Sequence, residues 1–129
     1  DSLMGIKVNF IQDNQSCSSK GTLRGLHFQT GDAAQAKLVR VISGSAYDIA
    51  VDLRPDSPTF KQWHGVELTE ENHLQFFIPR GFAHAFVALE DKTIFQYKVD
   101  KMCQLNHHMP HFLMSLYLVE MVLFCHYSV

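Results

Sequence analysis

The sequence predicts an all-β domain in which short strands close into a barrel. Short runs rich in Val, Ile, Leu, Phe and Tyr follow one another as far as about residue 100. Gly, Pro, Asp and Ser separate these runs, as is typical of turns between strands. Two of the runs carry a histidine among apolar neighbours. Regular short strands with such histidines indicate a sandwich or barrel with a polar pocket inside it.

Residues 18–29 contain the first histidine-bearing strand. Arg24, His27 and Gln29 alternate there with apolar residues and glycine. Side chains at alternate positions of a strand share one face. We therefore expect that face to present a cation, a proton carrier and an amide.

The next two strands are expected over residues 36–42 and 46–54, which are rich in Val, Leu and Ile. Residues 43–45 read Ser-Gly-Ser and give a turn signal, so we expect an antiparallel hairpin. In its second strand the two acids, Asp48 and Asp52, share a face. Acidic side chains on the inner face of a barrel are costly unless they have partners.

The rest of the β region follows a loop. Residues 54–59 contain two prolines and are expected to leave the sheet. The second histidine, His84, follows a turn that Pro79 and Gly81 fix. The remaining strands are expected at residues 63–68, 73–78, 84–89 and 93–99.

Length and charge bound the possible functions. The chain of 129 residues has room for one domain and its core. The net charge of −2 offers no excess of Lys and Arg for nucleic acid, so no nucleic-acid partner is expected. Cys17, Cys103 and Cys125 have no metal-type spacing and follow no signal peptide, which favours a reduced, cytoplasmic setting.

The composition changes abruptly after residue 101. Residues 102–129 contain no Lys or Arg and a single acid, Glu120, but four of the five methionines. The apolar run 112–124 is shorter than the roughly 20 residues of a membrane span, so no membrane partner is expected. We therefore expect a domain at residues 1–101, followed by an irregular or helical tail outside the barrel core. The histidines at 107, 108 and 111 lack an acid or cysteine that would complete a metal site.

Residues 79–84, Pro-Arg-Gly-Phe-Ala-His, fit the second motif of the cupin superfamily, Pro-x-Gly-x-x-His. More specifically, residues 10–101 resemble the dTDP-4-dehydrorhamnose 3,5-epimerase family. The resemblance implies a cupin-type jelly-roll barrel, a homodimer, and an isomerase acting on a dTDP-deoxysugar in rhamnose biosynthesis. The matching stretches are ordered along the chain at residues 12–14, 20–29, 34–40, 48–54, 57–59, 78–84 and 97–98.

The resemblance also implies roles for individual residues. Epimerisation beside a ketone needs a base, a group that stabilises the enolate oxygen, and an acid on the opposite face. His27 suits the base, since imidazole titrates near neutrality. Lys37 and Tyr97 match the family lysine near the ketone and the family acid. Arg24 and Arg40 are expected to hold the diphosphate, because guanidinium matches phosphate oxygens.

Other polar residues are expected to complete the substrate-binding set. Gln29 supplies an amide beside His27. His84 is expected either to support the site or to pack in the barrel, and Asp48 is expected to orient a cation or histidine of the site. Three of the residues given a role above also have a purely structural interpretation. Lys37 and Arg40 would suit a strand face exposed to solvent, and Tyr97 would suit a place in the core.

No catalytic metal and no other cofactor are expected. The first cupin motif supplies a His-x-His pair and a glutamate, whereas the corresponding stretch here is His27-Phe28-Gln29. One imidazole there and His84 would leave a metal short of protein ligands. The resemblance agrees, since that family works by acid and base alone.

The chain also departs from the family pattern. It begins after the family's N-terminal Asp-x-Arg-Gly type motif, and position 103 is Cys where the family stacks an aromatic ring on the base. Ala85 replaces a family glycine, and no aspartate after Asp100 is present to orient His27. Three readings stay open: an epimerase with reduced activity, a non-catalytic sugar-nucleotide-binding cupin, and a truncated inactive product. A single-site epimerase or ketoisomerase is a related alternative.

Overall fold

The computed structural model describes residues 2–3, 6–29 and 31–102. Predictions about residues 103–129, including the expected tail and its histidines, lie outside the described residues. Within the described part of the chain, no helix is long and apolar enough to cross a membrane.

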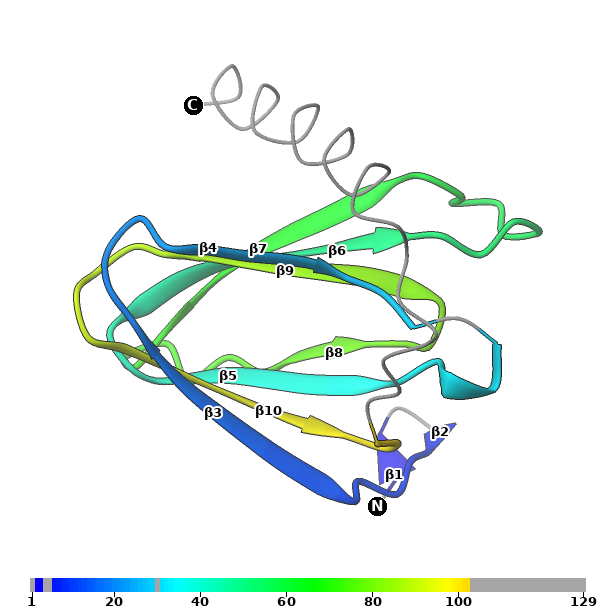
Figure 1. The fold of residues 1–129 in the computed structure, drawn as a ribbon, viewed down its shortest axis with the longest axis horizontal. Coiled ribbons are helices and arrows are strands. Elements are labelled where there is room, and N and C mark those ends of the chain that lie inside the picture. Colours follow the sequence, from blue (N-terminus) through cyan, green and yellow to red (C-terminus); the bar gives the residue numbers. More distant parts are fainter. Residues whose placement is uncertain (1, 4–5, 30, 103–129) are drawn as a thin grey trace.

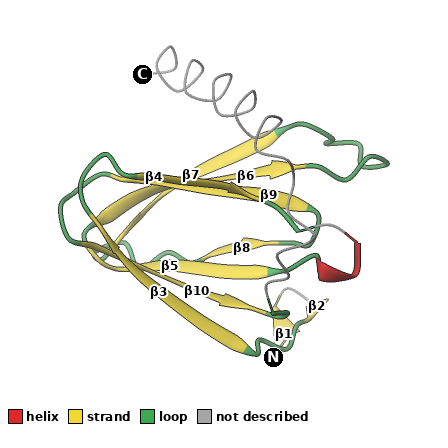
Figure 2. Ribbon diagram, viewed as in Figure 1, coloured by secondary structure: helices red, strands yellow, loops and turns green. Residues whose placement is uncertain are grey.

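Two antiparallel four-stranded sheets lie face to face, as the all-β jelly-roll prediction required (Figure 1). The first has the order β3-β10-β5-β8 and the second the order β4-β9-β6-β7. The short strands β1 and β2 form a separate pair, and the one helical turn among the described residues is η1 (Figure 2). The bounds are β1 Ser2–Leu3, β2 Ile6–Lys7, β3 Gln12–Ser18, β4 Leu23–His27, η1 Gly31–Ala33, β5 Lys37–Ser43, β6 Ser45–Asp52, β7 Trp63–Thr69, β8 Phe76–Ile78, β9 Phe82–Ala88 and β10 Thr93–Val99.

The main core lies between the two sheets. Val39 and Val41 of β5 face inward beside Phe95 of β10, and all three are buried. Phe86 of β9 stacks on Phe95 with ring centroids 4.0 Å apart, so the aromatic contact joins the two sheets. Alternation along β5 and β6 places every second side chain in this layer, as a two-sheet fold requires.

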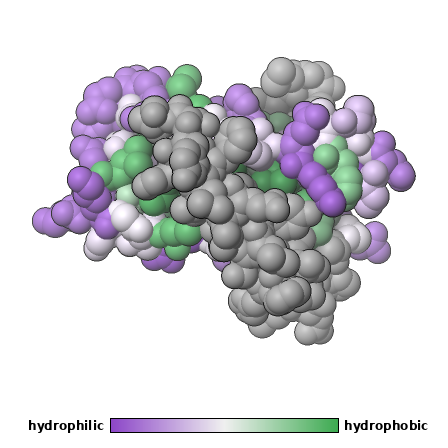
Figure 3. Space-filling model, turned by 90° about the horizontal axis from the view of Figure 1, so that it is seen from above, coloured by the Kyte–Doolittle hydropathy of each residue, from purple (hydrophilic) through white to green (hydrophobic). Residues whose placement is uncertain are grey.

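A second apolar cluster, formed by Leu26, Ile49, Val51, Ala83 and Ala85, lies on the β4-β9-β6-β7 sheet. These residues alternate with the inward-facing residues of the same strands, so they belong to the outer face of that sheet. Figure 3 shows this side of the molecule, with hydrophilic residues over both ends and apolar surface nearer the middle.

The predicted hairpin between residues 36–42 and 46–54 is wrong. Strand β5 pairs with β10 and β8, whereas β6 pairs with β7 and β9. Gly44 alone separates the two strands, which is too short for a two-residue hairpin loop. Its φ of +83° turns the chain from one sheet into the other, and a Cβ there would lie 2.6 Å from Oγ1 of Thr93.

The other strand predictions differ mainly at their ends. The expected strand 93–99 coincides with β10, and 63–68 falls one residue short of β7. The expected strand 73–78 reduces to β8, because His73 has a φ of +53° and its chain neighbour Asn72 forms reciprocal hydrogen bonds with Thr69. Strand β9 begins at Phe82, two residues before the expected start.

Asp52 has the partners that its inner position demands. It is 1% exposed, and Nε and Nη2 of Arg54 each donate to its carboxylate at 2.9 Å. The hydroxyls of Ser57 and Thr59 donate to the same carboxylate. Arg54 in turn covers the ring of Phe82, so this carboxylate fastens the predicted loop to the start of β9.

Candidate active site

A bulge in β4 brings Arg24 and His27 to the same pocket although they are three positions apart. The register shifts between Arg24, which pairs with Phe86, and His27, which pairs with His84. Gly25 allows the shift, since its φ is +120° and a Cβ there would lie 2.6 Å from the carbonyl oxygen of His84. The alternation expected from the sequence was to put Arg24 and His27 on one face, but residues three positions apart lie on opposite faces of a regular strand, so the shared face depends on the bulge.

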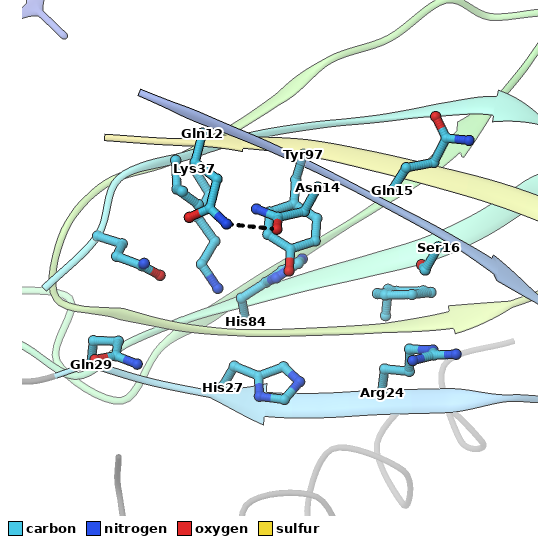
Figure 4. A pocket seen from close by; sticks show the side chains of 13 residues that line it. Gln12, Asn14, Gln15, Ser16, Arg24, His27, Gln29, Lys37, His84 and Tyr97 are labelled. Carbon is cyan, nitrogen blue, oxygen red and sulfur yellow. Dashed lines mark hydrogen bonds between the residues drawn. The ribbon is translucent and has the colours of Figure 1, made fainter. Parts of the chain in front are cut away.

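The pocket has a volume of about 450 Å³ and opens between the two sheets. It brings together the predicted catalytic residues His27, Lys37 and Tyr97 and three of the predicted substrate-binding residues (Figure 4). Those three are Arg24, Gln29 and His84.

The catalytic candidates occupy facing walls. His27 comes from β4, whereas Lys37 of β5 and Tyr97 of β10 come from the other sheet and extend toward it (Figure 4). Nζ of Lys37 lies 5.7 Å from the centre of the Tyr97 ring. A ligand in this pocket would therefore have an imidazole on one side and an ammonium and a phenol on the other.

Arg24 stands near the opposite end of the lining from Gln29 (Figure 4). Its side chain is exposed, and its Nε donates a 3.2 Å hydrogen bond to Oγ of Ser18. This contact holds the guanidinium at the pocket and leaves its terminal nitrogens for an anion.

His84 forms the buried floor of the pocket together with Phe86. Nε2 of His84 lies 3.0 Å from Oδ2 and 2.8 Å from Oδ1 of Asp48, which is fully buried on β6. The imidazole also stacks on Phe95, with the centroids 6.0 Å apart. Asp48 thus stands behind His84 and contacts it, but Asp48 does not line the pocket, and its expected role in orienting a histidine of the site stays a prediction.

Arg40 requires a correction, because the structure does not bring it to the pocket. Its neighbours Val39 and Val41 point into the core, so Arg40 faces outward from β5. Its Nε donates to Oε1 of Gln96 at 2.8 Å on the outside of the sheet. Arg40 therefore has no place beside Arg24 in this site.

Sequence reasoning missed the polar wall that β3 contributes. Gln12, Asn14 and Ser16 are half-buried and line the pocket, and Nε2 of Gln12 donates to Oδ1 of Asn14 at 3.2 Å (Figure 4). Gln35, after η1, adds another amide. The alternation Gln-Asp-Asn-Gln-Ser has no apolar residues to mark a buried face, so the usual strand signal is missing.

The arrangement suits proton transfer to and from a bound ligand. An imidazole and a phenol on facing walls can remove and return a proton on opposite sides, and an ammonium can stabilise negative charge between them. In the described residues, no three His, Cys, Asp or Glu side chains converge on a point where a metal ion could bind. The expected metal-free reaction remains a prediction.

Comparison with known proteins identifies what this chain resembles. A family profile described as dTDP-4-dehydrorhamnose 3,5-epimerase matches residues 2–111. The dTDP-4-dehydrorhamnose 3,5-epimerase of Salmonella typhimurium is 56% identical over 98 residues, which cover 76% of this chain and 54% of that protein. The chain spans about half the length of the curated relatives it matches.

Solved structures agree with the fold. The dTDP-4-dehydrorhamnose 3,5-epimerase of Bacillus anthracis, crystallised with TDP and PPi, has 50% identity and a TM-score of 0.79 over 81% of this chain and 61% of that one. The dTDP-6-deoxy-D-glucose-3,5-epimerase of Legionella pneumophila, in complex with dTDP-4-keto-L-rhamnose, has 48% identity and a TM-score of 0.79 over 82% of this chain and 56% of that one.

Proposed function

Because this chain belongs to the dTDP-4-dehydrorhamnose 3,5-epimerase family, we propose that it epimerises C3 and C5 of a dTDP-linked 4-keto-6-deoxy sugar. The observation that carries the proposal is the placement of His27 on one wall of the pocket and of Lys37 and Tyr97 on the other. Related enzymes of known structure bind TDP or a dTDP-4-keto sugar, which supports this substrate class.

The first step of the proposed reaction is removal of a proton next to the ketone. His27 takes the proton from the carbon, and the bonding pair forms a carbon–carbon double bond while the carbonyl oxygen becomes an enolate oxygen. The ammonium of Lys37 stabilises that oxygen, since Lys37 lines the pocket beside Tyr97, with Nζ 5.7 Å from the centre of the Tyr97 ring, on the wall that faces His27.

The second step returns a proton from the other side. The hydroxyl of Tyr97 donates to the carbon, the carbonyl re-forms, and the carbon is inverted. His27 ends protonated and Tyr97 ends as a phenolate, so exchange with water restores both groups. Nothing is oxidised or reduced, and repetition at the second carbon completes a double epimerisation.

Arg24 would meet the diphosphate of the substrate. The net charge of the chain is −2, so a phosphate group depends on individual placed cations rather than on a general basic surface. Arg24 is an exposed guanidinium at the pocket, whereas Arg40 faces outward from the other sheet. The amide wall of Gln12 and Asn14 offers hydrogen-bond donors for neutral parts of the ligand.

We also propose that the protein assembles as a homodimer. Within the described residues, strands β3 and β4 are edge strands of their respective sheets, and residues of both line the pocket. Unpaired edges favour association with another chain. Ile11, before β3, and Leu23, in β4, are exposed apolar side chains beside these edges. Light scattering after size-exclusion chromatography would give twice the mass of the chain, 14.7 kDa, if this proposal holds.

The experiment that tests the proposed reaction is product analysis by NMR. The purified chain is incubated with dTDP-4-dehydro-6-deoxyglucose, and the configuration at C3 and C5 is followed. We expect inversion at both carbons. Inversion at one carbon would support a single-site epimerase instead. Binding of the nucleotide sugar without inversion would support a non-catalytic binding protein.

A further inference from the structure

Asp100 uses both of its carboxylate oxygens, although it does not line the pocket. It follows the last residue of β10, and its side chain is only 6% exposed. Oδ1 accepts a 2.8 Å hydrogen bond from the backbone N–H of Ala36. Oδ2 accepts hydrogen bonds of 3.0 and 2.6 Å from Nε and Nη2 of Arg80. The carboxylate therefore joins three segments that are far apart in the sequence.

The contact with Ala36 closes the ladder between β5 and β10. The backbone N–H of Asp100 donates to the carbonyl oxygen of Ala36 at 3.3 Å. In a regular antiparallel pair the backbone carbonyl of Asp100 would accept the N–H of Ala36 in return, whereas here Oδ1 of the side chain accepts it. The end of this ladder thus depends on one side chain.

Lys37 is the first residue beyond this contact. It begins β5 and pairs with Val99 of β10 on one side and with Ile78 of β8 on the other. Arg80 follows Ile78 by two positions, and Asp100 follows Val99 by one. The ion pair between Asp100 and Arg80 therefore links the two strands that flank Lys37, just past the residues that pair with it.

A second connection fixes the segment that leads into β5. Nε2 of Gln35, which lines the pocket, donates to the carbonyl oxygen of Lys101 at 2.6 Å. Nζ of Lys101 donates to the carbonyl oxygen of Asp32 in η1 at 2.5 Å. The segment before Lys37 is thus held by the two residues that follow β10.

We infer that Asp100 is a positioning residue for Lys37. Its carboxylate, held by Arg80, fixes the N–H of Ala36 and with it the start of β5. The Lys37 ammonium extends from there into the pocket beside Tyr97 (Figure 4). Displacement of a reacting group by about 1 Å can cost on the order of a hundredfold in rate, so a residue that touches no ligand can still control the reaction. The inference rests on the proposed function for the reaction that Lys37 serves.

The position of Lys37 can be measured without any reaction. In the full chain, nuclear Overhauser effects between the ε-protons of Lys37 and the ring protons of Tyr97 report their contact. We expect this signal in the wild type, and a weaker or absent signal in Asp100→Ala. Asp13→Ala removes an exposed carboxylate that pairs with Lys98 in the same sheet, and as the matched control it should keep the signal. Undiminished intensity in Asp100→Ala would overturn the inference.

Two milder variants serve if Asp100→Ala does not fold. The amide of Asp100→Asn has one accepting oxygen, which can serve Ala36 or Arg80 but not both. Arg80→Met removes a guanidinium that is 51% exposed and leaves the carboxylate in place. We expect both variants to weaken the Overhauser signal between Lys37 and Tyr97. A full signal in both would contradict the inference.

A double-mutant cycle tests whether Asp100 acts through Lys37. We expect Asp100→Ala to lower kcat about tenfold or more with little change in KM, whereas in the Lys37→Met background the same substitution should lower kcat no further. Independent residues would give losses that multiply. The same fold-loss in both backgrounds, with all variants folded by circular dichroism, would contradict the positioning role. If the wild type shows no epimerisation, the proposed function fails, and the Overhauser signal alone decides whether Asp100 positions Lys37.

Discussion

Nζ of Lys37 lies 5.7 Å from the centre of the Tyr97 ring, on neighbouring strands of the sheet that faces His27. The register explains the contact, since Val99 pairs with Lys37 and Tyr97 pairs with Val39, so that Lys37 and Tyr97 are diagonal neighbours on one face. The cation and the acid of the proposed reaction are therefore held together, apart from the base. This separation leads to predictions that distinguish the steps.

Removal of the phenol hydroxyl should separate proton removal from inversion. In Tyr97→Phe the ring and its contact with Lys37 are kept, but the proton donor is lost. We expect inversion to slow roughly a hundredfold or more, while exchange of the substrate proton with solvent deuterium is affected less. Tyr47→Phe, on the outer face of β6, is the control, and unchanged inversion in Tyr97→Phe would remove Tyr97 from the acid role.

Loss of the Lys37 ammonium should destabilise the enolate formed during the reaction more than it weakens binding of the substrate in its ground state. Lys37→Met is expected to lower kcat on the order of a hundredfold and to change KM little, since the charge develops only as the proton leaves. Lys98→Met removes an exposed lysine from the next strand and should leave kcat unchanged. Steady-state kinetics of both variants decide the point. A rise in KM alone for Lys37→Met would assign Lys37 to substrate binding.

The two arginines should differ in their effect on nucleotide binding. Arg24→Leu removes a charged contact at the pocket and is expected to weaken dTDP binding about ten- to a hundredfold. Arg40→Leu changes the outer face of β5 and should leave the affinity unaltered. Titration calorimetry measures both dissociation constants. Equal affinity of the wild type and Arg24→Leu would show that the diphosphate binds elsewhere.

Asp52 should make stability depend on pH. Hydrogen bonds from the Arg54 side chain hold the pKa of Asp52 far below its ordinary value of about 4. A lowered folded-state pKa stabilises the protein above the unfolded value, and this contribution shrinks as the pH falls below it. Asp52→Asn should therefore lower the free energy of unfolding by about 1–3 kcal/mol at pH 7. The difference between the wild type and the variant should narrow below about pH 4. Urea unfolding of the wild type and Asp52→Asn between pH 7 and about pH 2 measures this difference in the free energy of unfolding. A difference that stays constant over the whole range would contradict the prediction.

Sequence reasoning predicted much of the site but not the way the strands combine. Period-2 patterns and turn residues located β7 and β10 almost to the residue, because these strands have clear alternation. The hairpin prediction failed because Ser43-Gly44-Ser45 looks the same whether the chain reverses within one sheet or crosses to the other. Long-range pairing with β9 and β10 decides that choice.

The positions of individual side chains also depend on long-range strand pairing, which the local sequence pattern does not give. The spacing of Arg24 and His27 gives no sign of the bulge that puts them on one side, since the register shift depends on the close approach of Gly25 to β9. The pairing of Asp48 with His84 joins residues that are 36 positions apart. The position of Asp48 on the inner face of its strand predicted that this carboxylate needs a partner. That the partner is His84 depends on the order of the strands in the sheet, which the sequence pattern does not give. Arg40 was misplaced because the inner face of β5 was not known.

Solvent exchange with His27→Ala tests the central claim most directly. The wild-type chain and the variant are each incubated in D₂O with dTDP-4-dehydro-6-deoxyglucose, and deuterium at C3 and C5 is followed by NMR. His64→Ala, which replaces an exposed histidine on β7, serves as the control. With His27 as the base, the wild type and His64→Ala incorporate deuterium, and His27→Ala does so on the order of a hundred- to ten-thousandfold more slowly. Equal rates for the wild type and His27→Ala would contradict the account.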